Sequence, residues 1–147
     1  MSPLVSAVSR LLLAPILVAA AALLVKGYNA SGDGFSAGTL AALAVLMRGA
    51  AVGGAGGRGD LAAGAMSPRA ALAGIAVMLA VVLAGPALGG QILEHWPPHG
   101  APKPPSLGHL ELHTALLYDV GIAIVVFVTI VSVIQMVARE RFPGRRR

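Results

Sequence analysis

The fold class of this chain is decided by residues 112–138, whose sequence is LHTALLYDVGIAIVVFVTIVSVIQMVA. Asp119 is the one Asp, Glu, Lys or Arg in that stretch. As a helix the stretch would be about 40 Å long at 1.5 Å per residue, which exceeds the roughly 30 Å hydrocarbon core of a bilayer. Residues 112–138 are therefore predicted to form a transmembrane helix.

Three further apolar stretches have the length of a membrane span. They are residues 4–26, 35–57 and 70–88. Four spans of about 20 residues take up more than half of the chain and leave no room for a separate soluble domain. We therefore expect an all-α integral membrane protein with a single membrane domain over 1–147. A proline-rich outer loop is expected at 89–111 and a basic cytoplasmic tail at 139–147.

The composition supports a membrane protein and excludes several other classes. Hydrophobic residues make up 56% of the 147 residues and charged residues 12%, whereas soluble domains carry about 25% charged residues. The absence of cysteine excludes a disulfide scaffold and any thiolate metal or redox site. The net charge of +5 is concentrated in the C-terminal tail, which favours a membrane anchor over a nucleic-acid partner.

Lysine and arginine in the short loops predict that both termini lie in the cytoplasm. This orientation places on the cytoplasmic side Arg10, Arg58, Arg69, Arg139, Arg141, Arg145, Arg146 and Arg147. It leaves Lys26 and Lys103 outside. The alternative for residues 4–26, a cleaved signal peptide, is disfavoured because no small-residue cleavage site follows Lys26.

Glycine recurs at spacings that suit close helix packing. Residues four apart lie on one helix face, where glycine lets a second backbone approach. The candidate packing residues are Gly38, Gly49, Gly53, Gly57 and Gly121. The alternative is a chance spacing in a chain with 19 glycines.

Among the ionisable residues inside predicted spans, Asp119 and Arg48 are the candidates for a function. Asp119 falls on the face of its helix opposite a packing seam that contains Gly121 and Val125. Intramembrane acids mark ion routes in many transporters, and the alternative is an interfacial carboxylate that reaches the headgroups. Arg48, in the middle of its span, needs a carboxylate, backbone carbonyls or water, and another subunit is a candidate source.

The histidines do not form a recognisable metal site. His109-x-Glu111-x-His113 would place both imidazoles on one helix face, but it is not an H-E-x-x-H motif and no third ligand is evident. We expect no metal and no cofactor, and we expect Glu111 and His113 to lie near a pore mouth, where they attract cations. The sequence contains no motif that pairs a nucleophile with a general base, so nothing in it indicates an enzyme.

Two segments resemble a known family. Residues 27–35, GYNASGDGF, followed by Gly38, resemble the G-H-N-x-P-G-G-G-F…G segment of the B subunit (MrpB/MnhB) of Mrp-type multisubunit sodium/proton antiporters. Residues 117–121, LYDVG, are similar to the L-[FL]-D-[IV]-G segment at the head of the last helix of that family. The matching residues of the first segment are Gly27, Asn29, Gly32, Gly34 and Phe35.

Three residues depart from the family pattern. Tyr28 stands where the family has His, Ser31 where it has Pro, and Asp33 where it has Gly. Ser31 removes the rigidity that proline gives a turn. Asp33 adds a charge, which makes it a further candidate for ion contact alongside Asp119.

The resemblance implies an accessory membrane subunit of a multisubunit antiporter that exchanges Na+ for H+ across a bacterial or archaeal cell membrane. It implies partners among the large A and D subunits, which resemble subunits of respiratory complex I, and among the small subunits. Two alternatives stay open. One is a purely structural scaffold in a related complex, such as an ion-translocating membrane-bound hydrogenase, and the other is an independent homo-oligomeric transporter.

Overall fold

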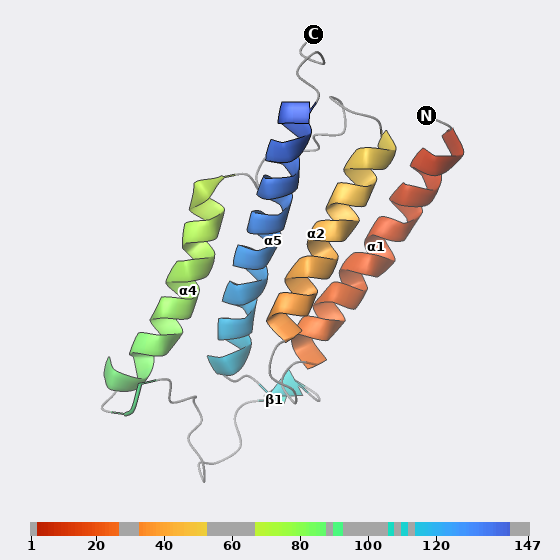
Figure 1. The fold of residues 1–147 in the computed structure, drawn as a ribbon. Helices are drawn as coiled ribbons and strands as arrows, with labels where there is room; N and C mark the ends of the chain where they lie inside the picture. Colours follow the sequence, from red (N-terminus) through yellow and green to blue (C-terminus); the bar gives the residue numbers. More distant parts are fainter. Residues whose placement is uncertain are drawn as a thin grey trace.

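A computed structural model describes residues 3–26, 33–52, 67–87, 90–92, 106–107, 110–111 and 114–141. Four helices are present in the described part of the chain, each long and apolar enough to cross a membrane (Figure 1). They are α1 (Pro3–Lys26), α2 (Asp33–Val52), α4 (Pro68–Ala87) and α5 (Thr114–Arg141). The prediction of an all-α membrane protein with four transmembrane helices is confirmed.

The helix ends follow from local sequence signals. α4 begins two residues before the predicted position 70 because Ser67 caps it and Pro68 occupies the first helical position, where no amide donor is needed. The Arg69 amide donates to Ser67 Oγ at 3.3 Å. α2 likewise begins at Asp33 rather than 35, and residues 53–57 of its predicted span lie outside the described residues.

The connection between α4 and α5 contains a two-stranded antiparallel ladder. Ser106–Leu107 (β1) pairs with Leu110–Glu111 (β2). β2 lies between positions 109 and 113, and α5 begins only at Thr114, so no described helix extends over both histidines, which themselves lie outside the described residues. The ladder consists of two residue pairs, Ser106 with Glu111 and Leu107 with Leu110, and it pairs part of the extended backbone that follows Pro105.

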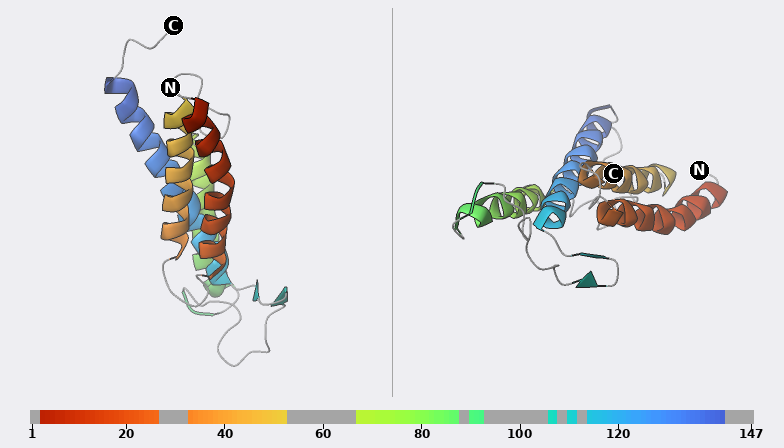
Figure 2. Two further views of the ribbon diagram at one scale, coloured as in Figure 1. Left: turned by 90° about the vertical axis from the view of Figure 1, so that its right-hand side faces the viewer. Right: turned by 90° about the horizontal axis from the view of Figure 1, so that it is seen from below.

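The four helices stand in a row in the order α1, α2, α5, α4 (Figure 2). α5 lies between α2 and α4, so that α1 and α4 are the outer helices. α2 and α5 run in the same direction, whereas α1 and α4 run in the opposite one. The start of α1 and the end of α5 therefore lie at the same end of the row (Figure 1).

Small residues make the close packing of α2 possible. Ala37, Ala42, Ala44 and Ala51 are buried, and Ala42 is fully covered by neighbouring helices. Ala42 meets Val131 of α5, and the two form the best-buried contact of the row. With few large side chains between them, the helix backbones approach closely.

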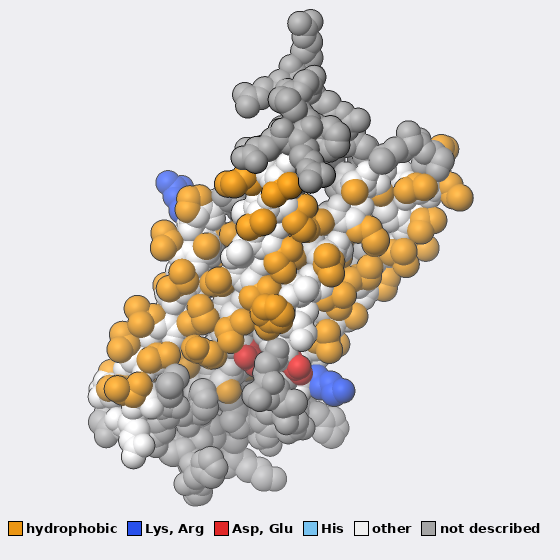
Figure 3. Space-filling model, in the orientation of Figure 1, with side chains coloured by type: hydrophobic (Ala, Val, Ile, Leu, Met, Phe, Trp, Pro, Cys, Tyr) orange, Lys and Arg blue, Asp and Glu red, His pale blue; other side chains and the backbone are white. Residues whose placement is uncertain are grey.

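Most large apolar side chains point outward instead. Leu11 of α1 is 77% exposed, and Leu72 of α4 is 62% exposed. The space-filling view shows hydrophobic side chains over the middle of the helices, with charged groups towards their ends (Figure 3). This distribution suits a surface in contact with lipid or with other membrane subunits.

Hydroxyl groups within the helices are satisfied locally. Thr39 donates to the Phe35 carbonyl oxygen at 2.9 Å, and Thr129 donates to the Val125 carbonyl oxygen at 2.7 Å. Ser9 is buried and donates to the Ser6 carbonyl oxygen at 3.0 Å. Bonds to a carbonyl three or four residues earlier let these side chains lie in an apolar environment without another partner.

Candidate functional site

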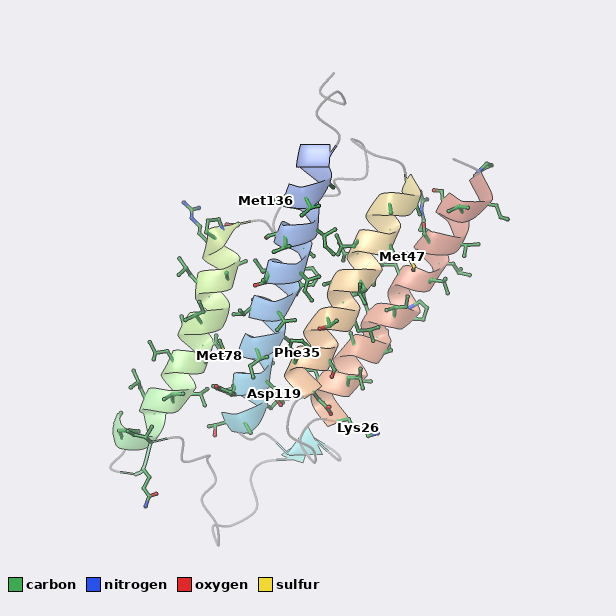
Figure 4. All side chains as sticks on the ribbon, viewed as in Figure 1. Lys26, Phe35, Met47, Met78, Asp119 and Met136 are labelled. Carbon is green, nitrogen blue, oxygen red and sulfur yellow. The ribbon has the colours of Figure 1, made fainter. Side chains whose placement is uncertain are left out.

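The charged side chains of the described residues divide between the two ends of the row. Lys26 ends α1, Asp33 begins α2, and Asp119 lies in the second turn of α5, all at the end where α2 and α5 begin. Lys26 and Asp119 are seen at this end in Figure 4. We call it the acidic end, because Asp33 and Asp119 are the acidic residues whose side chains are described.

The opposite end carries arginine, and we call it the arginine end. Arg10 lies in the first half of α1, Arg48 towards the end of α2, and Arg69 in the first turn of α4. The last turn of α5 also contains Arg139 and Arg141. Because the helices alternate in direction along the chain, arginines that are far apart in sequence meet at the same end.

Gly34 brings the two acidic residues of the acidic end together. A Cβ atom at Gly34 would lie 2.5 Å from the carbonyl oxygen of Asp119 and 3.0 Å from its Cα atom. The first turn of α2, which contains Asp33, therefore rests directly on the backbone of Asp119. Asp33 lies at the positive end of the α2 dipole, where a carboxylate is stabilised.

Gly38 repeats the same contact one turn further along α2. A Cβ atom at Gly38 would lie 2.5 Å from the carbonyl oxygen of Ala123 and 3.0 Å from its Cα atom. Gly34 and Gly38 are buried, as expected where two backbones touch. Together the two glycines set both the separation and the register of α2 and α5.

The other side of α5 packs on α4. A Cβ atom at Gly121 would lie 2.6 Å from Met78 Cγ and 2.9 Å from the Gly74 carbonyl oxygen. The expected packing seam through Gly121 and Val125 therefore faces α4, while the backbone of Asp119 faces α2. The face opposite the seam is thus packed as well, and a single seam was an incomplete prediction for this helix.

Gly74 and Met78 were not identified from the sequence. Ala70, Gly74 and Met78 are spaced four apart on α4, and the first two form a small-xxx-small pair. That pair is the signal that points to this face of α4. Met78 adds a flexible side chain over Gly121 (Figure 4).

Arg48 lies apart from Asp119. It is partly buried and stands four residues, or roughly 6 Å, before the end of α2 at Val52. In the described helix it is therefore close to the C-terminal end rather than in mid-span. A cation there is favoured by the helix dipole and reaches the headgroups through its flexible stem.

The remaining predicted residues are distributed as follows. Phe35 is 60% exposed on α2, and Gly49 of the same helix is partly buried. Glu111 belongs to β2. Outside the described residues lie His113, Gly27, Asn29, Gly32, Gly53 and Gly57. Among the residues that the structure describes, no group of three histidine or acidic side chains is arranged to hold a metal ion.

An open groove runs between α1, α2 and α5. Its volume is about 510 Å³, and we call it the apolar groove. Its lining consists entirely of apolar residues and glycine, and it includes small residues from all three helices. The residues are Leu17, Ala20, Ala21, Leu24, Ala37, Gly38, Ala41, Ala70, Val120, Ala123, Ile124, Phe127 and Val128.

Comparison with known proteins gives one match. A family model described as a domain related to the MnhB subunit of Na+/H+ antiporter matches residues 4–132, which include all four helices up to the last turns of α5. Searches of the curated proteins and of the solved structures found no significant match.

Proposed function

The chain belongs to the family of domains related to the MnhB subunit of Na+/H+ antiporters, and from this membership we propose that it is an accessory subunit of a multisubunit Na+/H+ antiporter. In this role it assembles with large subunits like those of respiratory complex I and with further small subunits. It contributes to assembly and lines part of the cation route. The transported ions, Na+ and H+, are its only proposed ligands.

The distribution of charge is the observation that carries this proposal. Within the spans Pro3–Lys26, Asp33–Ala51, Pro68–Ala87 and Thr114–Ala138, the carboxylates are those of Asp33 and Asp119, and both lie at the acidic end. A route across a hydrocarbon core of about 30 Å needs polar groups along its length. The described spans of this chain supply carboxylates at one end and arginines at the other, so other subunits have to supply the charged groups between them.

We place the acidic end at the mouth of the cation route. Asp119 is the principal residue, and Asp33, Glu111 and His113 add cation-attracting groups around it. A carboxylate inside a span costs about 2.5–3.5 kcal/mol at the membrane centre. Asp119 lies in the second turn of α5, where the cost is lower than at the centre, so a carboxylate there can be retained for a functional role.

Substitution of Asp119 tests the route. Asp119→Asn removes the charge and keeps the size, so we expect Na+/H+ exchange in vesicles to fall roughly tenfold, the effect of about 1.4 kcal/mol on one rate-limiting step. Asp33→Gly, which introduces the family residue and removes an accessory charge, should lower the exchange less than Asp119→Asn does. Full exchange by Asp119→Asn in a normally assembled complex would refute the role of Asp119.

A purely structural role is the second candidate, and the glycine contacts of α2 and α5 favour it. In that case the chain only holds neighbouring subunits in place, in an antiporter or in a related membrane-bound hydrogenase. Gly38→Leu would then abolish the complex on native gels, while Asp119→Asn would leave exchange unchanged. The ion-route proposal predicts a loss of exchange for Asp119→Asn with the complex intact.

A further inference from the structure

The apolar groove has three walls and lacks a fourth. α1 and α5 form its sides, and Ala37, Gly38 and Ala41 of α2 form its floor. α4 packs on the far side of α5 and contributes only Ala70 to the lining. In an antiparallel four-helix bundle a fourth helix would lie beside α1 and α5, and no described helix of this chain does so.

We propose that the apolar groove receives one transmembrane helix of another subunit. The inference rests on the proposed role as a subunit and adds which surface binds the partner. The partner segment is an uncharged helix that presents large apolar side chains over about two turns, because the groove extends along α5 from Val120 to Val128, roughly 12 Å.

The segments of these 147 residues outside the four helices do not suit the groove. Residues 53–66 are rich in glycine and contain Arg58 and Asp60. Residues 93–105 contain five prolines. Neither segment has the roughly 20 apolar residues of a membrane span. An occupant of matching apolar chemistry therefore has to come from outside these 147 residues, and a transmembrane helix of another subunit has that chemistry.

The small residues of the groove favour a helix over lipid. Glycine and alanine allow a second backbone to approach closely, whereas lipid chains pack equally well against leucine. The outer faces of the row carry large side chains, for example Leu4, Leu11 and Leu79, which are 73%, 77% and 53% exposed. The change from large to small side chains distinguishes the groove from these outer faces.

The position of the groove connects it with the acidic end. Val120 follows Asp119 directly, and Leu24 precedes Lys26 by two residues. A helix seated in the groove would therefore bring groups of the partner subunit next to Asp119.

Ala21 and Ala22 give a matched pair of test positions. Both are exposed, and Ala21 lines the groove whereas Ala22 does not. In the complex purified from the native membrane, Ala21→Phe should lower recovery of the partner subunits roughly tenfold, because overpacking an occupied site costs about as much as a tenfold change in binding. Ala22→Phe should give wild-type recovery. Equal recovery for both variants would overturn the proposal.

Crosslinking identifies the occupant without relying on a destabilising variant. A photoreactive benzophenone side chain at position 21 should form an adduct with an apolar transmembrane peptide of a co-purifying subunit, and the same group at position 22 should not. A lipid adduct alone, or an adduct with a second copy of this chain, would overturn the proposal. If the partners co-purify and position 21 forms no subunit adduct, only the groove proposal fails. If no partner co-purifies, the proposed function itself fails.

Discussion

Gly34 and Gly38 meet α5 in the same way, one helical turn apart. A Cβ atom at either would lie 2.5 Å from a carbonyl oxygen, that of Asp119 or that of Ala123. A backbone oxygen cannot turn aside as a side chain can, so any larger residue has to push the helices apart. The two glycines therefore share a steric role, but only Gly34 lies at a charged residue.

Substitutions at the two glycines can therefore separate an effect on helix packing from an effect on Na+ binding. Gly34→Ala and Gly38→Ala should each lower the unfolding free energy by about 1–3 kcal/mol, since both overpack one interface. Gly34→Ala should also raise the Na+ concentration needed for half-maximal exchange, because it displaces Asp119. Thermal unfolding in detergent and Na+ titration of vesicles measure the two effects. An equal shift in the Na+ requirement for both variants would contradict a positioning role for Gly34.

At the residue scale, the sequence indicates which residues are unusual better than where they lie. Asp119 stands out because a carboxylate inside an apolar span is costly. The distance of Arg48 from the end of its helix is harder to predict, because an apolar run of small residues is compatible with both a helix and a loop. The contact of Gly34 with the backbone of Asp119 is not predictable either, because it arises from packing between distant segments.

At the scale of the element, α5 is the organising helix. It packs on α2 through its backbone at Asp119 and Ala123, and on α4 through Gly121. Its sequence is apolar all round, so periodicity identifies small residues without showing how many neighbours they serve. That is the physical reason why one packing seam was expected and two packed faces are found.

The two faces of α5 should differ in their tolerance of substitution. Gly121→Ala meets the flexible Met78 side chain at 2.6 Å and a backbone oxygen at 2.9 Å, both less restrictive than the contact at Gly38. We expect Gly121→Ala to lower the midpoint of thermal unfolding less than Gly38→Ala does. Addition of Met78→Ala should recover part of the loss, because the effects of substitutions at contacting residues on the unfolding free energy are not additive. A larger loss for Gly121→Ala than for Gly38→Ala would refute this order.

At the scale of the whole molecule, the four helices place Asp33 and Asp119 at one end of the row and Arg10, Arg48 and Arg69 at the other. The number and type of spans follow from the sequence, because apolar length alone specifies them. The order α1, α2, α5, α4 does not, since four apolar helices can be arranged in several ways. The open groove follows from that order, because α4 packs beyond α5 instead of closing against α1.

The arginine end should face the cytoplasm. Positive residues are retained on the cytoplasmic side of membrane proteins, and this end collects Arg10, Arg48 and Arg69. Alkaline phosphatase fused after Arg147 should therefore be inactive, while the same reporter inserted after Lys103 should be active. Activity of the fusion after Arg147 would place the acidic end inside instead.

The most direct test of the central claim is to purify the tagged chain from its native membrane in mild detergent and to identify the co-purifying polypeptides by mass. Exchange of Na+ for H+ is then measured in vesicles made with the complex and with the chain alone. We predict that large and small antiporter subunits accompany the chain in a constant ratio, and that only the complex exchanges ions. Recovery of the chain without partners, together with full exchange by the chain alone, would contradict its role as an accessory subunit.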